Sequence, residues 1–373
     1  MTLIFLQLGK FLMRIVYPVL KLFPTQHKIV FLSRQLNKPP KDFTMLESEI
    51  LTRDPSTKII MICGRIESTP AGFVRFIWKI CCAMYHVATA RVAILDTYSP
   101  IISLLHHKST LTVIQIWHAM GKIKQSGYRN LDTEGSGRSS RVAKVMKMHK
   151  GYDLIVAGAA AWNPFYQESF HVSEDLLYNV GLPRIDYMLQ NREFLRQKIF
   201  KKYAHLGAKP IIVYAPTWRR TGIDGWDALI SQFNFDQFDL IVKCHPNQNL
   251  DVPAGEVYTL PDFETLECLA IADYLVTDYS ATAVEAAALN VKTYYYLYDY
   301  EIYEEKNGLN IDLFAEMAGC VFKEAKDLIQ ALDAEYPHHS FEKYQSKFLP
   351  DTMGQSTVLI TNKIMKSLEV QRR

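Results

Sequence analysis

His118 is the residue whose surroundings in the sequence most suggest chemistry. It follows an apolar run that includes Val113, Ile114 and Ile116, and a Gly-Lys pair comes three residues later. Such a run is typical of a buried strand, and a parallel strand delivers the next side chains to the carboxyl edge of its sheet. An imidazole has an ordinary pKa of about 6.5, so His118 could accept a proton at neutral pH. By itself, a core histidine bonded to a backbone carbonyl explains the pattern equally well.

Polar side chains also follow three predicted strands in the second half of the chain. These residues are Thr217 and Arg219, Lys243 and His245, and Ser280 and Thr282. Ligands of open α/β sheets bind beyond the carboxyl ends of the strands, so the three sets predict one phosphate site. Ser280 is placed to cap a helix, where its hydroxyl and the next N–H groups face an anion. Glu285, one turn later, is either a ribose ligand or an exposed helix residue.

A row of cations follows the His118 segment at every third position. Its members are Arg138, Arg141, Lys144, Lys147 and Lys150. No acidic residue between Glu134 and Asp153 balances them. Together with Lys122 and Lys124 they predict a surface that binds a phosphate, although a solvated helix face is the plainer alternative. No recognisable nucleic-acid module surrounds the row, so nucleic acid is not an expected partner.

Several common catalytic patterns are absent from the sequence. It contains no Walker loop and no GxGxxG, HExxH or GxSxG motif. Asp278 and Asp299 are too isolated to predict a metal site, and no strong nucleophile has a partner. We therefore expect neither a metal, nor a cofactor, nor a covalent intermediate.

The amino-terminal segment, residues 1–24, is apolar but interrupted by Lys10, Arg14 and Lys21, which share one face of a helix. Residues 72–91 repeat this spacing of polar groups among aromatic and aliphatic side chains. A span across a bilayer needs about 20 uninterrupted apolar residues, so a helix lying in an anionic membrane surface fits better. A helix packed on its own domain is the alternative.

The positions of the predicted elements indicate the fold class. Strands are expected at 28–32, 58–63, 92–96, 113–116, 152–158, 210–215, 240–243, 274–277 and 292–297, with a short strand leading into a turn at 178–183 and helices between most of them. This alternation predicts two doubly wound parallel sheets, which a chain of 373 residues is long enough to form. A break at 207–210 is the expected junction. With 49% hydrophobic residues, extensive disorder is excluded.

Four segments together resemble one known family. Residues 117–121 (WHAMG), 214–219 (YAPTWR), 243–246 (KCHP) and 277–280 (TDYS), with 298–303 and Gly308 after them, resemble the CDP-glycerol glycerophosphotransferases of wall teichoic acid synthesis. The chain length is similar to that of the short primase branch, called TagB or TarB. One departure is Ala281, where family members often have a second hydroxyl residue.

The resemblance implies a GT-B fold, in which two Rossmann-like domains face each other across a cleft. It implies an acceptor-binding domain at 25–205, a CDP-glycerol-binding domain at 206–350 and a carboxyl-terminal helix at 351–373. It also implies peripheral attachment to the cytoplasmic face of a bacterial membrane. The implied reaction moves glycerol phosphate from CDP-glycerol to the N-acetylmannosamine of an undecaprenyl-diphosphate-linked disaccharide and releases CMP.

Within that reaction, His118 would be the base, with His245 as a second catalytic histidine. The expected donor ligands are Arg219, Thr217, Lys243, Ser280, Thr282 and Glu285. The expected acceptor ligands are Lys122, Lys124, Arg138, Arg141 and Lys144. Three alternatives remain open at this point: a transferase that adds a second glycerol phosphate or polymerises, a GT-B glycosyltransferase that uses a UDP-sugar, and a non-catalytic membrane-surface protein.

Overall fold

The computed structural model describes residues 2–35, 37–65, 69–135, 137–219, 225–244, 248, 250 and 255–369. The chain forms two compact units. Unit 1 comprises Met1–His118, Ser126–Asp186 and Gly354–Arg373, and unit 2 comprises Ala119–Gln125 and Tyr187–Met353. The chain therefore passes between the units four times, and the first passage comes directly after His118.

Unit 1 is built on a six-stranded sheet in which every neighbouring pair is parallel. Its strands are β1 (Lys28–Ser33), β2 (Lys58–Cys63), β3 (Val92–Leu95), β4 (Thr112–Gln115), β5 (Leu154–Val156) and β6 (Leu177–Tyr178). Their order is β2-β1-β3-β4-β5-β6, so the direction of winding reverses between β1 and β3. A crevice for ligands is expected beyond the carboxyl ends of strands at such a reversal.

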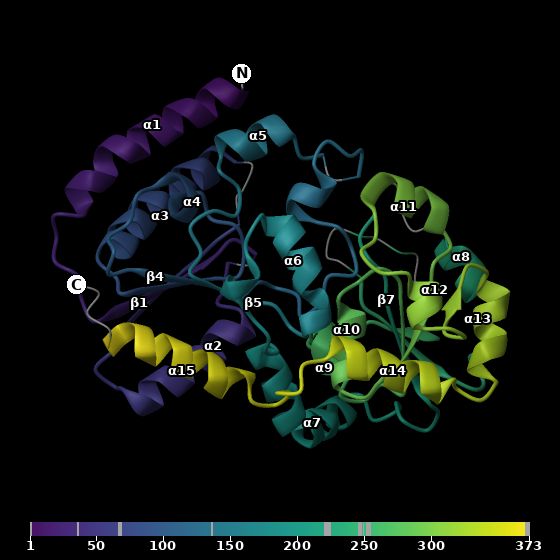
Figure 1. Ribbon diagram of the computed structural model, residues 1–373. Helices are drawn as coiled ribbons and strands as arrows, with labels where there is room; N and C mark the ends of the chain where they lie inside the picture. The colour runs from purple at the N-terminus through teal and green to yellow at the C-terminus, as the bar shows by residue number, and fades with distance from the viewer. Residues whose placement is uncertain are drawn as a thin grey trace. The chain divides into compact units, whose positions relative to one another are not determined.

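Helices cover both faces of this sheet (Figure 1). On one side lie α1 (Thr2–Leu20), α3 (Pro70–Ala88) and α4 (Pro100–Leu104), with α3 packed against both neighbours. On the other side α2 (Lys41–Arg53) packs against α15 (Ser356–Glu369). The remaining helices of four or more residues in the described part of unit 1 are η1 (Gly127–Asn130), α5 (Ser140–Val145) and α6 (Asn163–Phe170). The strands β1, β3 and β4 are buried throughout, as expected of a sheet covered on two faces.

Unit 2 has a second six-stranded parallel sheet. Its strands are β7 (Ile211–Ala215), β8 (Asp239–Val242), β9 (Val257–Tyr258), β10 (Tyr274–Thr277), β11 (Lys292–Tyr296) and β12 (Val321–Phe322). The order β12-β11-β10-β7-β8-β9 is the Rossmann order read from the other edge. The reversal point lies between β7 and β10, the strands that the sequence analysis connects with Thr217 and Ser280.

The helices of unit 2 pack on its sheet and on each other. They are α8 (Gly225–Ile230), α9 (Thr265–Cys268), α10 (Thr282–Ala288), α11 (Tyr300–Asn307), α12 (Leu313–Glu316), α13 (Ala325–Leu332) and α14 (His338–Phe348). The helix α10 contacts β10, β11, α9 and α14, whereas α13 contacts β11, β12 and α8. The long helix α7 (Pro183–Lys202) begins in unit 1 and continues into unit 2.

The structure confirms the predicted fold class of parallel α/β sheets, and every strand predicted above is present within a few residues. The two-residue strands β9 and β12 were not predicted, because they are too short to show a pattern. The expected junction at 207–210 follows the end of α7, while the division between units lies inside α7, between Asp186 and Tyr187. The Gly and Pro residues at 207–210 show where the helix must end. They do not show at which residue the chain passes from one unit to the other.

Candidate active site

The main chain just before His118 has an unusual conformation. The strand β4 ends at Gln115, and the side-chain Oε1 of Gln115 accepts a hydrogen bond from the backbone N of Trp117 at 2.9 Å. Trp117 has a φ of 57°, which lies in the left-handed region and strains a bulky side chain. Its indole lies against the His118 ring, with centroids 4.2 Å apart. This turn replaces a smooth strand end and directs His118 out of the sheet.

The hydrogen bond of the His118 ring defines its proton arrangement. The ring Nδ1 lies 3.1 Å from the main-chain carbonyl oxygen of Asp96, which follows β3. A carbonyl oxygen can only accept, so Nδ1 carries the hydrogen in the neutral ring and Nε2 carries the lone pair. His118 is exposed to solvent, and this excludes the alternative of a core histidine. The side chain has the tautomer and the accessibility of a general base.

Asp96 lies at the reversal point of the unit 1 sheet. Its Oδ2 accepts a hydrogen bond of 2.6 Å from the hydroxyl of Ser33, the last residue of β1. Burial raises the pKa of Asp96 to about 6, although hydrogen bonds from Ser33 and Thr97 oppose the shift and the charge of Asp42 adds to it. Asp96 therefore connects the carboxyl ends of β1 and β3 with the His118 ring.

The structure places Lys122 and Lys124 in unit 2. Lys122 is buried, with 3% of its surface exposed, and burial lowers its pKa to about 7. Lys124 pairs with Leu309 in an isolated antiparallel bridge, and the amide of Asn310 donates to the carbonyls of both lysines. The two lysines thus do not belong to the unit that carries the Arg138 row, and a buried Lys122 does not fit an open acceptor surface.

Arg219, which follows β7, is held by two carboxylates. Its Nε donates to Asp299 Oδ2 at 2.8 Å, and its Nη2 lies 3.0 Å from Asp278 Oδ2. Its Nη1 donates to the carbonyl of Thr217 at 2.9 Å. The guanidinium also lies over the ring of Tyr303, 4.7 Å from the centroid. With its side chain 10% exposed, Arg219 fixes the strand ends, and these contacts leave it few N–H groups for a ligand.

Asp278 joins the two strands at the reversal point of unit 2. It accepts hydrogen bonds from the backbone N of Thr217 at 2.9 and 3.0 Å and from the Thr217 hydroxyl at 2.6 Å. Within the described residues, the ammonium group of Lys124 forms no hydrogen bond or ion pair. It does interact electrostatically with the charges of Asp278 and Arg219. Burial lowers the pKa of Lys124, Asp278 raises it and Arg219 lowers it further. Unlike Arg219, Lys124 thus has N–H donors that could bind a ligand at this cluster.

The hydroxyls of Ser280 and Thr282 are half-buried beside this cluster. They lie 3.0 Å apart, and the backbone N of Thr282 donates to Ser280 Oγ at 3.3 Å. The helix α10 begins at Thr282 with Ala281 as its N-cap, one residue later than the sequence analysis expects. Glu285 is buried, so the alternative of an exposed helix residue is excluded.

Two further residues predicted to bind the donor are Lys243 and His245. The ammonium of Lys243 donates to the carbonyls of Thr259, Leu260 and Phe263 at 3.1, 3.1 and 2.6 Å. An ammonium has three donors, so these bonds saturate Lys243 and tie β8 to the segment after β9. His245 lies outside the described residues.

Exposed cations gather around α5 in unit 1. Arg138, Arg141 and Lys144 are exposed, together with Lys147 and Lys150, but α5 ends at Val145, so the row does not follow one helix. Lys10 of α1 donates to the carbonyl of Val145 at 3.0 Å. This bond places the basic segment next to α1, as Figure 1 also shows.

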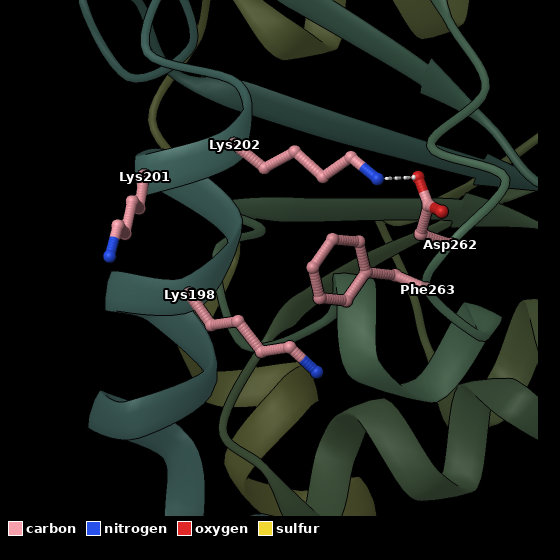
Figure 2. Close-up of a pocket in the computed structure, with 5 residues that line it drawn as sticks. All are labelled: Lys198, Lys201, Lys202, Asp262 and Phe263. Atoms are coloured by element: carbon pink, nitrogen blue, oxygen red, sulfur yellow. Dashed lines mark hydrogen bonds and ion pairs between the residues drawn. The ribbon is translucent and has the colours of Figure 1, made fainter.

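A hollow of about 530 Å³ on unit 2 is lined by Lys198, Lys201, Lys202, Asp262 and Phe263. Figure 2 shows Lys202 reaching Asp262, at 2.5 Å, while Lys201 points away from both. None of the predicted site residues lines this hollow. Within the described residues, no three His, Cys, Asp or Glu side chains gather in a way that could hold a metal ion.

The sequence profile described as CDP-Glycerol:Poly(glycerophosphate) glycerophosphotransferase matches residues 15–366. The chain belongs to this family. A teichoic acid ribitol-phosphate primase of Bacillus spizizenii is 27% identical to this transferase over 93% of both chains. A teichoic acid glycerol-phosphate primase of Bacillus subtilis is 25% identical over 75% of this chain and 74% of its own. The chain spans 60% of a B. spizizenii poly(ribitol-phosphate) polymerase at 25% identity.

Solved structures show the same fold. The wall teichoic acid polymerase TagF superposes on this transferase with a TM-score of 0.74 at 17% identity, covering 94% of this chain and 91% of the other. A UDP-GlcNAc 2-epimerase from Neisseria meningitidis gives a TM-score of 0.59 at 12% identity, covering 91% and 100%. These likenesses extend over both sheets of the transferase.

Asp96 and Arg184, whose Nη2 donates to the His118 carbonyl at 2.9 Å, are not among the predicted site residues, and Lys124 was predicted for the acceptor and not for its position beside Asp278. Asp96 comes directly after the strand VAIL, so the strand-end argument that selected His118 would have found it. Arg184 and Lys124 carry no such signal, because their partners lie far away in the chain.

Proposed function

We propose that this transferase moves glycerol phosphate from CDP-glycerol to the N-acetylmannosamine of an undecaprenyl-diphosphate-linked disaccharide, as a primase that acts on the cytoplasmic face of the membrane. The observation that carries the proposal is the fixed tautomer of His118 in a chain whose family match runs from residue 15 to 366. A sugar hydroxyl is a poor nucleophile, whereas CMP leaves with a phosphate whose second pKa is about 6. The base is therefore needed on the attacking side.

In the proposed step, His118 Nε2 takes the proton of the acceptor hydroxyl while the oxygen bonds to the phosphorus of the glycerol phosphate. The bond from that phosphorus to the CMP oxygen breaks, and CMP leaves with the electron pair. The proton then passes from His118 to solvent. The Nδ1–H bond to Asp96 holds the ring in one orientation through both changes.

For the donor we propose a site at the reversal point of unit 2. Ser280 and Thr282 offer hydroxyls, and Lys124 offers the positive charge that Arg219 has committed to Asp278 and Asp299. Lys124 is therefore proposed as a ligand of the donor and not, as the sequence suggested, of the acceptor. Glu285, Thr217, Lys243 and His245 remain in the proposal as residues that shape or complete this site.

For the acceptor we propose the exposed cations around α5, since a lipid-linked diphosphate would meet them next to α1. No helix in the described part of the chain is long and apolar enough to cross a membrane. However, α1 and α3 carry most of the exposed large apolar side chains. On these helices and the turn after α1 they are Leu8, Phe11, Leu12, Ile15, Val16, Val19, Leu22, Phe23, Val74, Ile77 and Trp78.

Three cations of these helices, Lys10, Lys21 and Lys79, bond to main-chain carbonyls of unit 1, while Arg14 and Arg75 are exposed. Lys10 and Lys21 donate to the carbonyls of Val145 and His106 at 3.0 Å, and Lys79 donates to that of Cys63 at 2.8 Å. Outward-facing apolar side chains on two adjacent helices form what we call the α1–α3 apolar face. A surface of this kind is suited to insertion between lipid headgroups.

A second donor is favoured by one observation. The alignment with the ribitol-phosphate primase covers 93% of this chain, whereas that with the B. subtilis glycerol-phosphate primase covers 75%. CDP-ribitol is therefore the second candidate donor.

One incubation separates these functions. The protein is supplied with CDP-glycerol, CDP-ribitol or a UDP-sugar and a synthetic lipid-linked disaccharide, and the product mass is measured. A gain of one glycerol phosphate supports the primase, and a ladder of products supports a polymerase. Release of UMP or UDP without any release of CMP would overturn the proposal.

A further inference from the structure

An ion pair in unit 1 reaches the main chain of His118. Arg184 Nη1 lies 2.5 Å from Asp42 Oδ2, and the backbone N of Arg184 donates to Asp42 Oδ1 at 2.8 Å. The other terminal nitrogen, Nη2, donates to the carbonyl oxygen of His118 at 2.9 Å. Arg184 thus connects a carboxylate on α2 with the residue that the proposed reaction uses as its base.

This ion pair is well suited to hold a fixed geometry. Asp42 is 3% exposed and the side chain of Arg184 is 16% exposed, so water competes little for either charge. Charge-assisted hydrogen bonds of a planar guanidinium constrain direction as well as distance. Because Asp42 binds both the side chain and the backbone of Arg184, the guanidinium has little freedom to turn away from His118.

Three hydrogen bonds surround the His118 ring and its backbone. Gln115 holds the backbone N of Trp117, Asp96 holds the ring Nδ1, and Arg184 holds the His118 carbonyl. Trp117 is strained at a φ of 57°, and such a conformation persists only when its surroundings enforce it. Without the Arg184 bond, the strained turn can relax and the ring can leave the Asp96 carbonyl.

We propose that Arg184 is a positioning residue for catalysis. Oriented by Asp42, it fixes the His118 main chain so that Nδ1 stays bonded to Asp96 and the lone pair stays on Nε2. The proposal rests on His118 being the base of the proposed function. A misplacement of about 1 Å can cost about 100-fold in rate. We therefore expect Arg184→Gln to lower kcat by about 10- to 100-fold and to leave the KM for CDP-glycerol within about twofold.

The variants separate positioning from folding. Arg184→Gln leaves the buried Asp42 charge without its partner, so this variant is expected to lose stability. In Asp42→Asn/Arg184→Gln both charges are absent, and we expect Tm to recover while kcat stays low. Asp42→Asn alone keeps one oxygen that can accept a hydrogen bond from Arg184, so the Arg184–His118 bond should persist and kcat should stay within about threefold. Arg184→Lys, whose single ammonium cannot reproduce the fork, should fall between Arg184→Gln and wild type.

Arg192→Gln is the matched control. Arg192 lies on the same helix and donates to a backbone carbonyl, that of Leu289, at the same 2.9 Å. Its loss should leave kcat unchanged. Recovery of kcat together with Tm in the double variant would show that Arg184 only stabilises the fold, and would overturn the proposal.

A second measurement does not need turnover. In 15N spectra of histidine-labelled protein, His118 is assigned by its absence in His118→Gln. We expect the Nδ1–H tautomer in wild type and in Arg192→Gln, and a mixture of tautomers in Arg184→Gln and in the double variant. An unchanged tautomer in those two variants would overturn the positioning role. Full activity of His118→Gln would instead overturn the proposed role of His118 as the base. The tautomer measurement would then still report whether Arg184 orients the ring, but not a role in catalysis.

Discussion

Replacing Phe11 with Ser tests whether the α1–α3 apolar face binds a membrane. Phe11 is 60% exposed in the middle of α1, and its neighbours on that face are apolar as well. Lys10, beside it in the sequence, donates to a carbonyl of unit 1 and thus fixes which side of α1 points outward. Because Phe11 has little packing to lose, the substitution should leave the fold and its Tm unchanged.

The size of the effect follows from the exposed area. A Phe side chain contributes about 200 Å² of apolar surface, so 60% exposure leaves about 120 Å² in water. At about 25 cal/mol per Å², withdrawal of that area into lipid is worth about 3 kcal/mol. A difference of 1.4 kcal/mol is tenfold in affinity, so the upper limit is about 100-fold. We expect at least a tenfold loss, since an interfacial side chain is not fully withdrawn from water.

The assay is co-sedimentation of the full chain with phosphatidylcholine vesicles, with and without phosphatidylglycerol. Phe194→Ser is the matched control, because Phe194 has the same 60% exposure but lies on α7. Phe11→Ser should weaken binding to both kinds of vesicle, and Phe194→Ser should weaken neither. Turnover on a water-soluble acceptor analogue should be the same in both variants.

Equal binding by Phe11→Ser and wild type would refute the reasoning about this helix. Trp78, 70% exposed on α3, offers the next test of the same face. If Phe11→Ser/Trp78→Ser also binds as wild type does, the α1–α3 apolar face does not contact lipid. An equal loss in Phe194→Ser would show that any exposed aromatic side chain gives the effect.

Further predictions concern the two sites. His118→Gln should lower kcat by 10²- to 10⁴-fold without changing Tm, and a loss below tenfold would exclude His118 as the base. Lys124→Met should raise the KM for CDP-glycerol by at least tenfold and leave the KM for the acceptor unchanged; the opposite result would return Lys124 to the acceptor. For Asp96→Asn, urea unfolding should show that the stability of wild type relative to the variant increases as pH falls from about 7 to about 4. The folded protein takes up the Asp96 proton near pH 6 and the unfolded chain near 4, so the difference should change by at most about 3 kcal/mol, and a difference independent of pH would contradict the shift.

The sequence is sufficient to place the strand ends. Runs such as KIVFL and KIIMIC are typical of strands, and the polar residues after β7 and β10 are brought together because parallel strands share a carboxyl edge. The same logic selected His118. Strand ends alone do not reveal that Arg219 pairs with Asp299 or that Lys243 donates to the carbonyls after β9, because these partners come from other parts of the chain.

The amino-acid sequence by itself determined the alternation of strands and helices, the family and the residue types at each strand end, since these depend on local periodicity and on short motifs. Only the tertiary structure decided what each polar group faces. The cations of α1 turn toward backbone carbonyls, which leaves the apolar side chains outside, and Lys124 lies with Asp278 in unit 2. His118 is an exposed side chain and not a core histidine, and Nδ1 carries the hydrogen of its neutral ring because the Asp96 carbonyl can accept a hydrogen bond but cannot donate one.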